Sequence, residues 1–358
     1  MELMFRWPTW SQNLYFFKNM QYLKFLIYFL FSKLIFLSIY FSKFRNINLL
    51  YTSHYGFGDH LFFCVEVRDK LNSNTKIFCF SKQQNETASF FFEKENIINS
   101  FLLMPKFMNE SHIGYHFLSK NINFKPSNFK RIAPDNSLIP ISLWYCGTKQ
   151  SIGFIKQKID SSKISREIKN IFKKPTLCFF VKNFSKHKNN HFNFQVRQTR
   201  DLDKINKLLN YLDKQKINIL ILGTKKDHFI QILNEDVKKE KFNNVYFFKD
   251  LSENFSIGDQ AFSAFNSIGY VGSVTGTMGF FGLLNKQAVL INAVSYYTDK
   301  YWDNFTFLYK KIFNKNTKLT QNFKWKEHYD SKENEISENT YDEIKLIVEK
   351  KILNKDRI

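Results

Sequence analysis

One stretch near the C-terminal third of the chain constrains the fold more than any other. A short apolar strand at residues 268–271 leads into a loop of glycine and hydroxyl residues at 272–277. An apolar segment of helix length follows, and a second apolar strand begins at Ala288. This strand–loop–helix–strand order is typical of parallel sheets, in which a helix crosses between neighbouring strands. We therefore expect an α/β fold built on a parallel sheet.

The loop itself has the composition of an anion-binding loop. Ser273, Thr275, Gly276 and Thr277 are small, and they immediately precede the apolar helix. Such a loop presents free backbone N–H groups and the positive end of the helix dipole toward one point. That arrangement suits a phosphate or a diphosphate. The plain alternative is that one of the three hydroxyl residues is an ordinary N-cap of the helix.

Composition limits the kinds of partner. The chain has 358 residues, which favours two domains over one. Its net charge is +21, but the basic residues are spread along the chain, and Lys, Asn, Ile and Phe are all abundant, as AT-rich codons would give. No zinc finger, RNP-type aromatic motif or basic-region helix is present, so we expect no nucleic-acid partner. The charge suits an anionic membrane surface or a phosphorylated substrate.

Four cysteines lie far apart without a CxxC pair, which favours buried free thiols over a metal site or disulfides. His187 and His191 are four residues apart but have no nearby carboxylate, so we expect no metal there either.

The N-terminal 45 residues form a segment of their own. Residues 25–41 are almost wholly apolar with one charge, Lys33, and basic residues flank them on both sides. Their length is near the lower limit for a membrane span, and a helix lying in the interface is the alternative. An ordinary buried helix is the third possibility. We expect residues 12–45 to bind the membrane, with the rest of the protein at the cytoplasmic face of the inner membrane.

Two α/β sets follow this segment. The first has a strand at 47–52, a glycine loop at 54–60, a helix at 61–71 and a strand at 76–80. The second has strands at 176–181 and 217–222 around a helix that begins at Asp201. Spacing places Ile205, Leu208, Leu209 and Leu212 on one face of that helix. Thr340 and Glu343 resemble a capping box before a final helix.

A glycine loop ends the first predicted strand, where ligands of open α/β sheets collect. Gly56 and Gly58 permit a tight turn, and Asp59 and His60 follow. A carboxylate there could take the proton of an attacking hydroxyl. The alternative is that Asp59 only caps the next helix. Because the loop lacks the GxGxxG pattern and a later acidic residue, a dinucleotide cofactor is not indicated.

Two arginines, Arg197 and Arg200, precede the helix of the second set. Guanidinium groups bind phosphate oxygens with two parallel hydrogen bonds. Solvated arginines are the alternative, although a helix N-terminus is an unfavourable place for positive charge. No Asp-x-Asp metal motif stands out, since Asp201 and Asp203 fit a helix start better.

In order and spacing these pieces resemble the two-domain GT-B glycosyltransferases of the heptosyltransferase type, used in bacterial surface-glycan assembly. The family's first loop reads roughly G-x-x-G-D, and the chain has Tyr55-Gly-Phe-Gly-Asp59 in that place. The family's late loop reads roughly T-G-x-M-H, and the chain has Thr275 to Met278 there. Gly279 stands where the family usually has His, and Asn285 begins the turn where it has G-K-P. The resemblance covers residues 47 to about 295 and does not assign the donor sugar.

The resemblance implies two Rossmann-like parallel-sheet domains facing a cleft, behind an apolar N-terminal helix. The expected parts are a membrane-associated segment at 1–45, an acceptor domain at 46–165 and a donor domain at 166–358. Asp59 would be the base, beside an acceptor loop with Gly56, Gly58 and His60. The donor diphosphate would be held by Arg197, Arg200, Ser273, Thr275, Gly276, Thr277 and Met278.

The implied function is metal-independent sugar transfer from a nucleotide-sugar donor to a glycan, glycolipid or lipopolysaccharide acceptor. The donor is a substrate, and no cofactor is expected. Two alternatives remain open: a nucleotide-sugar epimerase on the same fold, and a non-catalytic protein that binds glycan or nucleotide.

Overall fold

The structure is a computed structural model. It describes residues 30, 34, 48–50, 57–71, 73, 75–79, 81–99, 147–183, 198–223, 228–240, 242–294, 303–323 and 333–353. The chain forms two compact units, one of Met1–Tyr55 with Glu66–Ser137, and one of Gly56–Val65 with Leu138–Ile358.

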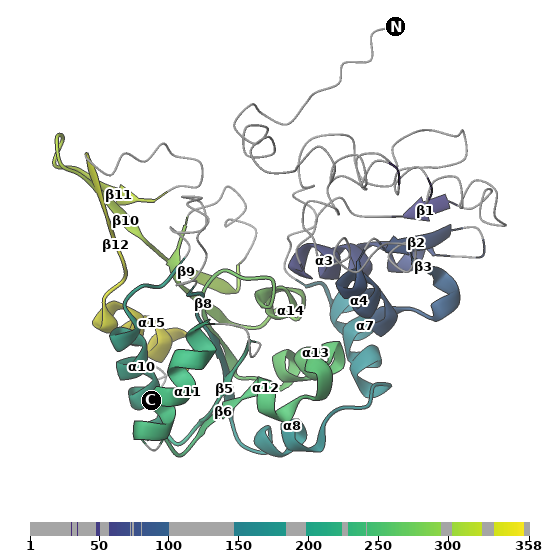
Figure 1. Cartoon of the computed structure of the whole chain (residues 1–358), viewed down its shortest axis with the longest axis horizontal. Helices are drawn as coiled ribbons and strands as arrows, with labels where there is room; N and C mark the ends of the chain where they lie inside the picture. The colour runs from purple at the N-terminus through teal and green to yellow at the C-terminus, as the bar shows by residue number, and fades with distance from the viewer. Residues whose placement is uncertain are drawn as a thin grey trace, which may run out of the picture. The chain divides into compact units, whose positions relative to one another are not determined.

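The second unit is built on a six-stranded sheet in which every strand pair is parallel (Figure 1). Its strands are β4 (Thr176–Phe180), β5 (Asn218–Ile221), β6 (Val245–Phe247), β7 (Gly269–Gly272), β8 (Ala288–Ala293) and β9 (Phe305–Tyr309). Residues of β4, β5, β7 and β8 are buried throughout, as expected of strands covered on both faces. The predicted strands at 176–181, 217–222, 268–271 and 288–291 are thereby confirmed, and so is the α/β class.

The strand order of this sheet is β6-β5-β4-β7-β8-β9. The chain steps outward from β4 to β6, returns to the other side of β4 and steps outward again to β9. This is the order of the doubly wound dinucleotide-binding fold. Its reversal falls between β4 and β7, and ligands of such sheets bind beyond the carboxyl ends of the strands at that point.

Helices cover both faces of the sheet (Figure 1). Those on one side are α10 (Leu202–Lys214), α11 (His228–Glu240) and α15 (Tyr341–Lys351), and those on the other include α7 (Lys149–Asp160), α8 (Arg166–Ile171), α13 (Ile257–Asn266) and α14 (Met278–Leu283). Two short turns, α12 (Phe248–Leu251) and η5 (Glu253–Phe255), follow β6. The four apolar residues predicted to share one face of α10 are its buried residues. The predicted capping box of Thr340 and Glu343 is also present.

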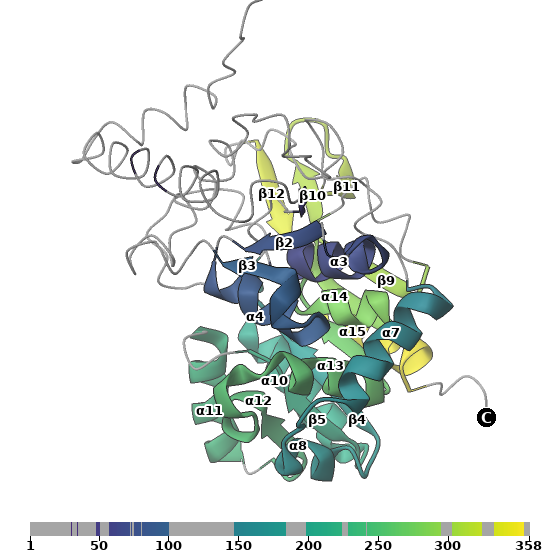
Figure 2. The ribbon, with the colours of Figure 1, turned by 90° about the vertical axis from the view of Figure 1, so that its right-hand side faces the viewer.

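A small antiparallel sheet projects from the end of this unit, beside β9 (Figures 1 and 2). Its strand order is β11-β10-β12, with β10 at Lys311–Asn314, β11 at Thr320–Asn322 and β12 at Asn334–Ser337. The sequence did not predict it, because its strands are short and mostly polar. Phe305, Phe307 and Tyr309 in β9 show the period-two alternation by which that strand could have been found.

The described part of the first unit is a parallel sheet of three strands in the order β1-β2-β3. They are β1 (Asn48–Leu50), β2 (Thr75–Cys79) and β3 (Ile97–Asn99), with helix α4 (Lys82–Phe91) between the last two. Two single helical turns, at Arg68–Lys70 and Lys94–Asn96, also belong to this part of the chain. The predicted domain boundaries at 45 and 165 stay predictions.

Helix α3 spans Phe57–Val67, so it begins four residues before the predicted start at Leu61. Gly58, Asp59 and His60 therefore lie in its first turn, not in a loop, and Gly56 lies outside the described residues. As the third residue of the helix, Asp59 does not occupy the N-cap position. The early start was hidden because glycine is a poor helix former.

Most of the predicted membrane segment lies outside the described residues. Leu30 and Leu34 are helical and exposed. Within the part of the chain that the structure describes, there is no helix long and apolar enough to cross a membrane.

The prediction of buried free thiols is confirmed for the three cysteines among the described residues. Cys64, Cys79 and Cys178 are free and buried. Burial raises the pKa of the Cys79 and Cys178 thiols above the usual range. Cys146 lies outside the described residues.

The close approach of β4 and β7 depends on a glycine. A Cβ on Gly272 would lie 1.9 Å from the Phe180 carbonyl oxygen. We expect Gly272→Ala to destabilise the protein by about 3 kcal/mol or more, since backbone atoms cannot give way as side chains do. Gly153→Ala in α7 is the control, because a Cβ there meets nothing within 4 Å. Replacing a helical glycine by alanine should stabilise by about 0.5–1 kcal/mol. Equal melting temperatures for the two variants would contradict this packing.

Candidate functional site

The candidate site lies at the carboxyl ends of β4 and β7, where the strand order reverses. Ser273 joins the two loops that leave these strands. Its N–H donates to the Phe180 carbonyl at 2.9 Å, and its Oγ accepts from the N–H of Lys182 at 3.0 Å. Ser273 is 2% exposed, so its hydroxyl serves to fix the two loops together.

The loop from Val274 to Thr277 presents unused backbone donors. The N–H groups of Met278 and Gly279 turn back onto the carbonyls of Thr275 and Gly276, at 3.2 and 3.0 Å. Among the described residues, none accepts a hydrogen bond from the N–H groups of residues 274–277. These four residues are partly exposed. Four consecutive N–H groups without an acceptor in the described part of the chain, next to a helix start, have the arrangement that suits anionic oxygens.

The hydroxyl groups of the loop do not cap the helix. Thr277 stands at the N-cap position of α14, but its backbone is helical and its side chain makes no capping bond. The Ser273 hydroxyl is engaged with Lys182, and the Thr275 hydroxyl neighbours the phenol of Tyr270. None of the three hydroxyl groups caps the helix, so the N-cap alternative for this loop is wrong.

The buried side chain of Tyr270 supports the loop from below, a role that was not predicted from the sequence. Its hydroxyl lies 3.0 Å from the Ser273 carbonyl and 3.3 Å from the Phe180 carbonyl. Burial raises the pKa of the phenol, a group that is protonated at neutral pH in any case and can therefore donate. A phenol inside a central parallel strand was the one available signal, since buried Tyr hydroxyls need a partner.

The first turn of α3 lies against the loop. A Cβ on Gly276 would be 2.9 Å from the Gly58 nitrogen and 3.3 Å from the Phe57 Cβ. The Phe57 ring packs on Phe280 of α14, with ring centres 6.1 Å apart. The start of α3, and with it Asp59, is therefore next to the free donors. The positive end of the α3 dipole lies at the same place.

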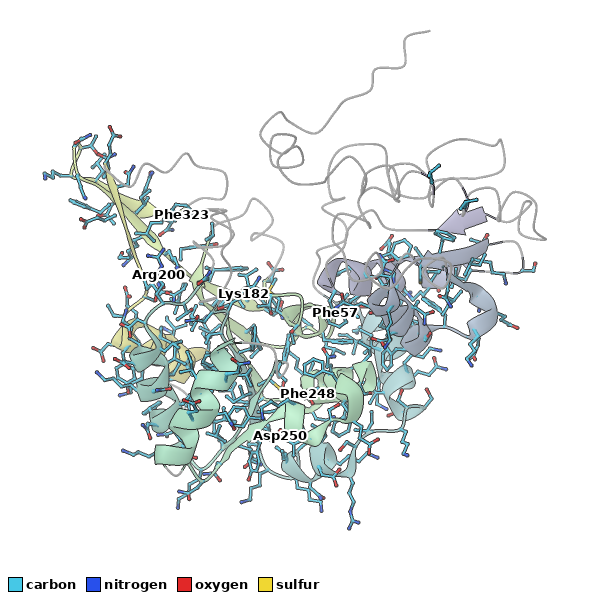
Figure 3. The ribbon with its side chains drawn as sticks, in the orientation of Figure 1. Phe57, Lys182, Arg200, Phe248, Asp250 and Phe323 are labelled. Carbon is cyan, nitrogen blue, oxygen red and sulfur yellow. The ribbon has the colours of Figure 1, made fainter. Side chains whose placement is uncertain are left out.

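The loop after β4 returns to this site. The Thr199 N–H donates to the Lys182 carbonyl at 2.9 Å, and the Asn183 amide donates to the Thr199 carbonyl at 3.0 Å. Arg200 comes next and is exposed, with Asp201 capping α10 behind it. In the view of Figure 3, Lys182 lies between Arg200 and Phe57. Arg197 is outside the described residues.

Besides Ser273, two more predicted site residues have buried side chains. His60 is 1% exposed and stacks on Phe63 with ring centres 5.5 Å apart, and Met278 is 3% exposed. Both therefore belong to the packed contact around α3 and α14. The described residues hold no group of three or more His, Cys, Asp or Glu that could bind a metal ion.

No protein-family model matches the chain. No curated protein matches it either. Solved structures of heptosyltransferases match over most of the chain, at low identity. A family 9 glycosyltransferase from Veillonella parvula has 12% identity and a TM-score of 0.44, covering 73% of this chain and 85% of its own. The E. coli heptosyltransferase WaaC with ADP has 12% identity and a TM-score of 0.43, covering 87% and 100%. E. coli ADP-heptose heptosyltransferase II has 11% identity and a TM-score of 0.39, covering 74% and 90%.

Proposed function

We propose that the protein is a glycosyltransferase that moves a sugar from a nucleotide-sugar donor to a surface-glycan or lipid-linked acceptor. The observation that carries this proposal is the row of N–H groups at residues 274–277, which have no acceptor among the described residues. The row lies where the strand order of the six-stranded sheet reverses. A nucleoside diphosphate is the ligand that such a row at such a place fits best.

Transfer from a sugar nucleotide needs positive charge for the departing diphosphate and a base for the acceptor. The loop at 273–278 supplies the first through its donors and two helix starts, and Arg197 and Arg200 add full charges. This set needs no metal ion. Asp59, in the helical turn beside the loop, is the group that we assign as the base.

In the proposed architecture the two α/β sets of the sequence are the halves of a GT-B enzyme. The second has the complete Rossmann strand order, and the first begins with three parallel strands in sequence order. We assign residues 46–165 to the acceptor and residues 166–358 to the donor. The apolar segment at 1–45 precedes both.

A binding experiment tests whether the protein binds a nucleoside diphosphate at all. Purified protein is heated with a panel of nucleoside diphosphates, and the melting temperature is recorded for each. At about 100 times its Kd, a ligand adds about 2.7 kcal/mol of stability. We expect at least one diphosphate to raise the melting temperature and the matching monophosphate or nucleoside to raise it much less. If no diphosphate of the panel raises the melting temperature, the proposal is wrong.

Two other functions use the same loop. A non-catalytic binding protein would be stabilised by the nucleotide but would not cleave a nucleotide sugar. An epimerase would convert the sugar without passing it to an acceptor. Donor cleavage distinguishes the first from an enzyme, and sugar retained on an acceptor distinguishes a transferase from an epimerase.

We also propose that residues 12–45 hold the protein at the cytoplasmic face of the inner membrane. The apolar run with basic flanks supports this. Full-length protein should sediment with membranes, and a chain beginning at residue 46 should stay in the supernatant. Release by carbonate would indicate an interfacial helix, and release by detergent alone would indicate a span. Full-length protein that is monomeric in the supernatant without detergent would contradict membrane binding.

A further inference from the structure

A buried ion pair contacts residues 198–201, close to the candidate site. Neither of its two residues was assigned to that site. Lys310 follows β9 and is 2% exposed, and its Nζ lies 3.2 Å from Glu338 Oε1. Glu338 follows β12, and its side chain is 10% exposed. Two charges removed from water are costly unless their remaining hydrogen-bonding capacity is also used.

That remaining capacity is used on the segment 198–201. Lys310 Nζ donates to the Gln198 carbonyl at 2.6 Å. The Glu338 carboxylate accepts from the N–H groups of Arg200, at 2.8 Å, and Asp201, at 3.3 Å. The pair therefore fixes the start of α10 by its backbone, from both the donor and the acceptor side.

Neighbouring amides extend the connection. Asn339 and Asn292 each accept the backbone N–H of the other through the side-chain oxygen, at 2.6 and 2.8 Å. The Asn292 amide then donates to the Thr199 Oγ1 at 3.1 Å. Asn292 has a φ of 51°, an uncommon value for a residue other than glycine, and the reciprocal pair with Asn339 holds it there.

From Thr199 the connection reaches the loop in two steps. The Thr199 N–H donates to the Lys182 carbonyl, and the Lys182 N–H donates to Ser273 Oγ. Hydrogen bonds and the backbone of residues 198–201 thus connect Lys310 and Glu338 with Ser273, which directly precedes the four N–H groups of residues 274–277, here called the free-donor loop. Fully satisfied buried networks of this kind make the groups they join rigid.

Resting on the proposed function, we propose that Lys310 and Glu338 are positioning residues for the donor diphosphate. They hold residues 198–201 against Lys182. In this way they fix the position of Arg200 and, through Lys182, that of Ser273 at the start of the loop. Neither side chain needs to touch the donor. The small antiparallel sheet beyond β9 would accordingly have a role in donor binding, because Glu338 directly follows its strand β12.

The test must separate positioning from stability. Lys310→Met alone leaves the Glu338 charge buried without its partner, which would unfold many proteins. The double variant Lys310→Met with Glu338→Gln removes both charges, and the new amide oxygen can accept only one of the two N–H groups that the carboxylate accepts. We expect this variant to fold with a melting temperature close to that of the wild type. We expect its Kd for the stabilising nucleoside diphosphate to rise about tenfold, with the donor KM rising more than kcat falls.

The matched control removes a neighbouring ion pair between β10 and α15. Lys311 and Glu343 lie 3.0 Å apart, and within the described part of the chain neither bonds to residues 198–201. Lys311→Met with Glu343→Gln keeps a capping side chain on α15 and should bind the diphosphate as the wild type does. A wild-type Kd in the Lys310–Glu338 double variant would overturn the inference and leave the proposed function standing. A wild-type protein that binds no diphosphate would overturn both.

A third variant settles the matter if the double variant does not fold. Thr199→Val keeps the shape of the side chain and removes the acceptor used by Asn292. It removes one of the bonds that hold residues 198–201 in place and changes no charge, so it should also raise the Kd. A Thr199→Val protein that is folded and has the wild-type Kd would overturn the inference.

Discussion

Asp59→Asn is expected to lower the rate of sugar transfer by about two to four orders of magnitude, the usual contribution of a positioned general base. The amide keeps the shape of the side chain and removes its ability to accept a proton. Donor affinity should barely change, because the free donors at 274–277 and the arginines supply it. Single-turnover rates and donor Kd values, measured on the same preparations, provide the comparison.

Asp69→Asn is the matched control for this substitution. Asp69 lies in the single turn that follows α3, is 80% exposed and pairs with Arg68. The same chemical change there should leave transfer unaltered. If Asp59→Asn transfers sugar at nearly the wild-type rate, Asp59 only interacts with the α3 dipole, an effect of about 0.3–1 kcal/mol on stability. If it loses donor affinity instead, the assignment of its role is wrong.

The second large effect concerns the free-donor loop. Gly276→Val places a branched side chain where even a Cβ would lie 2.9 Å from the Gly58 nitrogen. The loop must then move away from the start of α3, and its donors no longer converge. Stabilisation by a nucleoside diphosphate, about 2.7 kcal/mol at 100 times the wild-type Kd, should disappear. Melting curves with and without the diphosphate measure it.

Gly279→Ala is the control for the contact between α3 and α14. A Cβ there would lie 3.2 Å from Leu61 Cδ2, the end of a flexible side chain, and the donors at 274–277 would stay in place. The protein should lose little stability and keep its response to the diphosphate. A Gly276→Val protein that is folded and still stabilised as strongly as the wild type would show that the loop is not the binding place.

The sequence predicted the regular elements of the second unit well, because their signals are local. The apolar face of α10 repeats at helical spacing, and the buried strands are continuous apolar runs. The capping box of α15 is a four-residue pattern. Such features depend on neighbours in the sequence and need no knowledge of the tertiary structure.

The candidate site was predicted only in part, because its geometry depends on distant residues. The loop at 273–277 was identified by composition, but the sequence could not show that none of its hydroxyl groups caps α14. Glu338 contacts Arg200 from 138 residues away, and no local pattern announces such a pair. The early start of α3 was missed because Gly58 is a helix breaker in isolation and is tolerated here by close packing against Gly276.

The central claim is that the N–H groups of residues 274–277 bind a diphosphate, and the amide of Gly276 can report this directly. The chain has 12 glycines, so selective ¹⁵N labelling of glycine gives a sparse amide spectrum, and Gly276→Ala identifies the signal. Titration with the stabilising nucleoside diphosphate should shift the Gly276 signal in proportion to saturation and leave the Gly153 signal in α7 unmoved. A Gly276 signal that stays in place while the nucleotide binds would contradict the account.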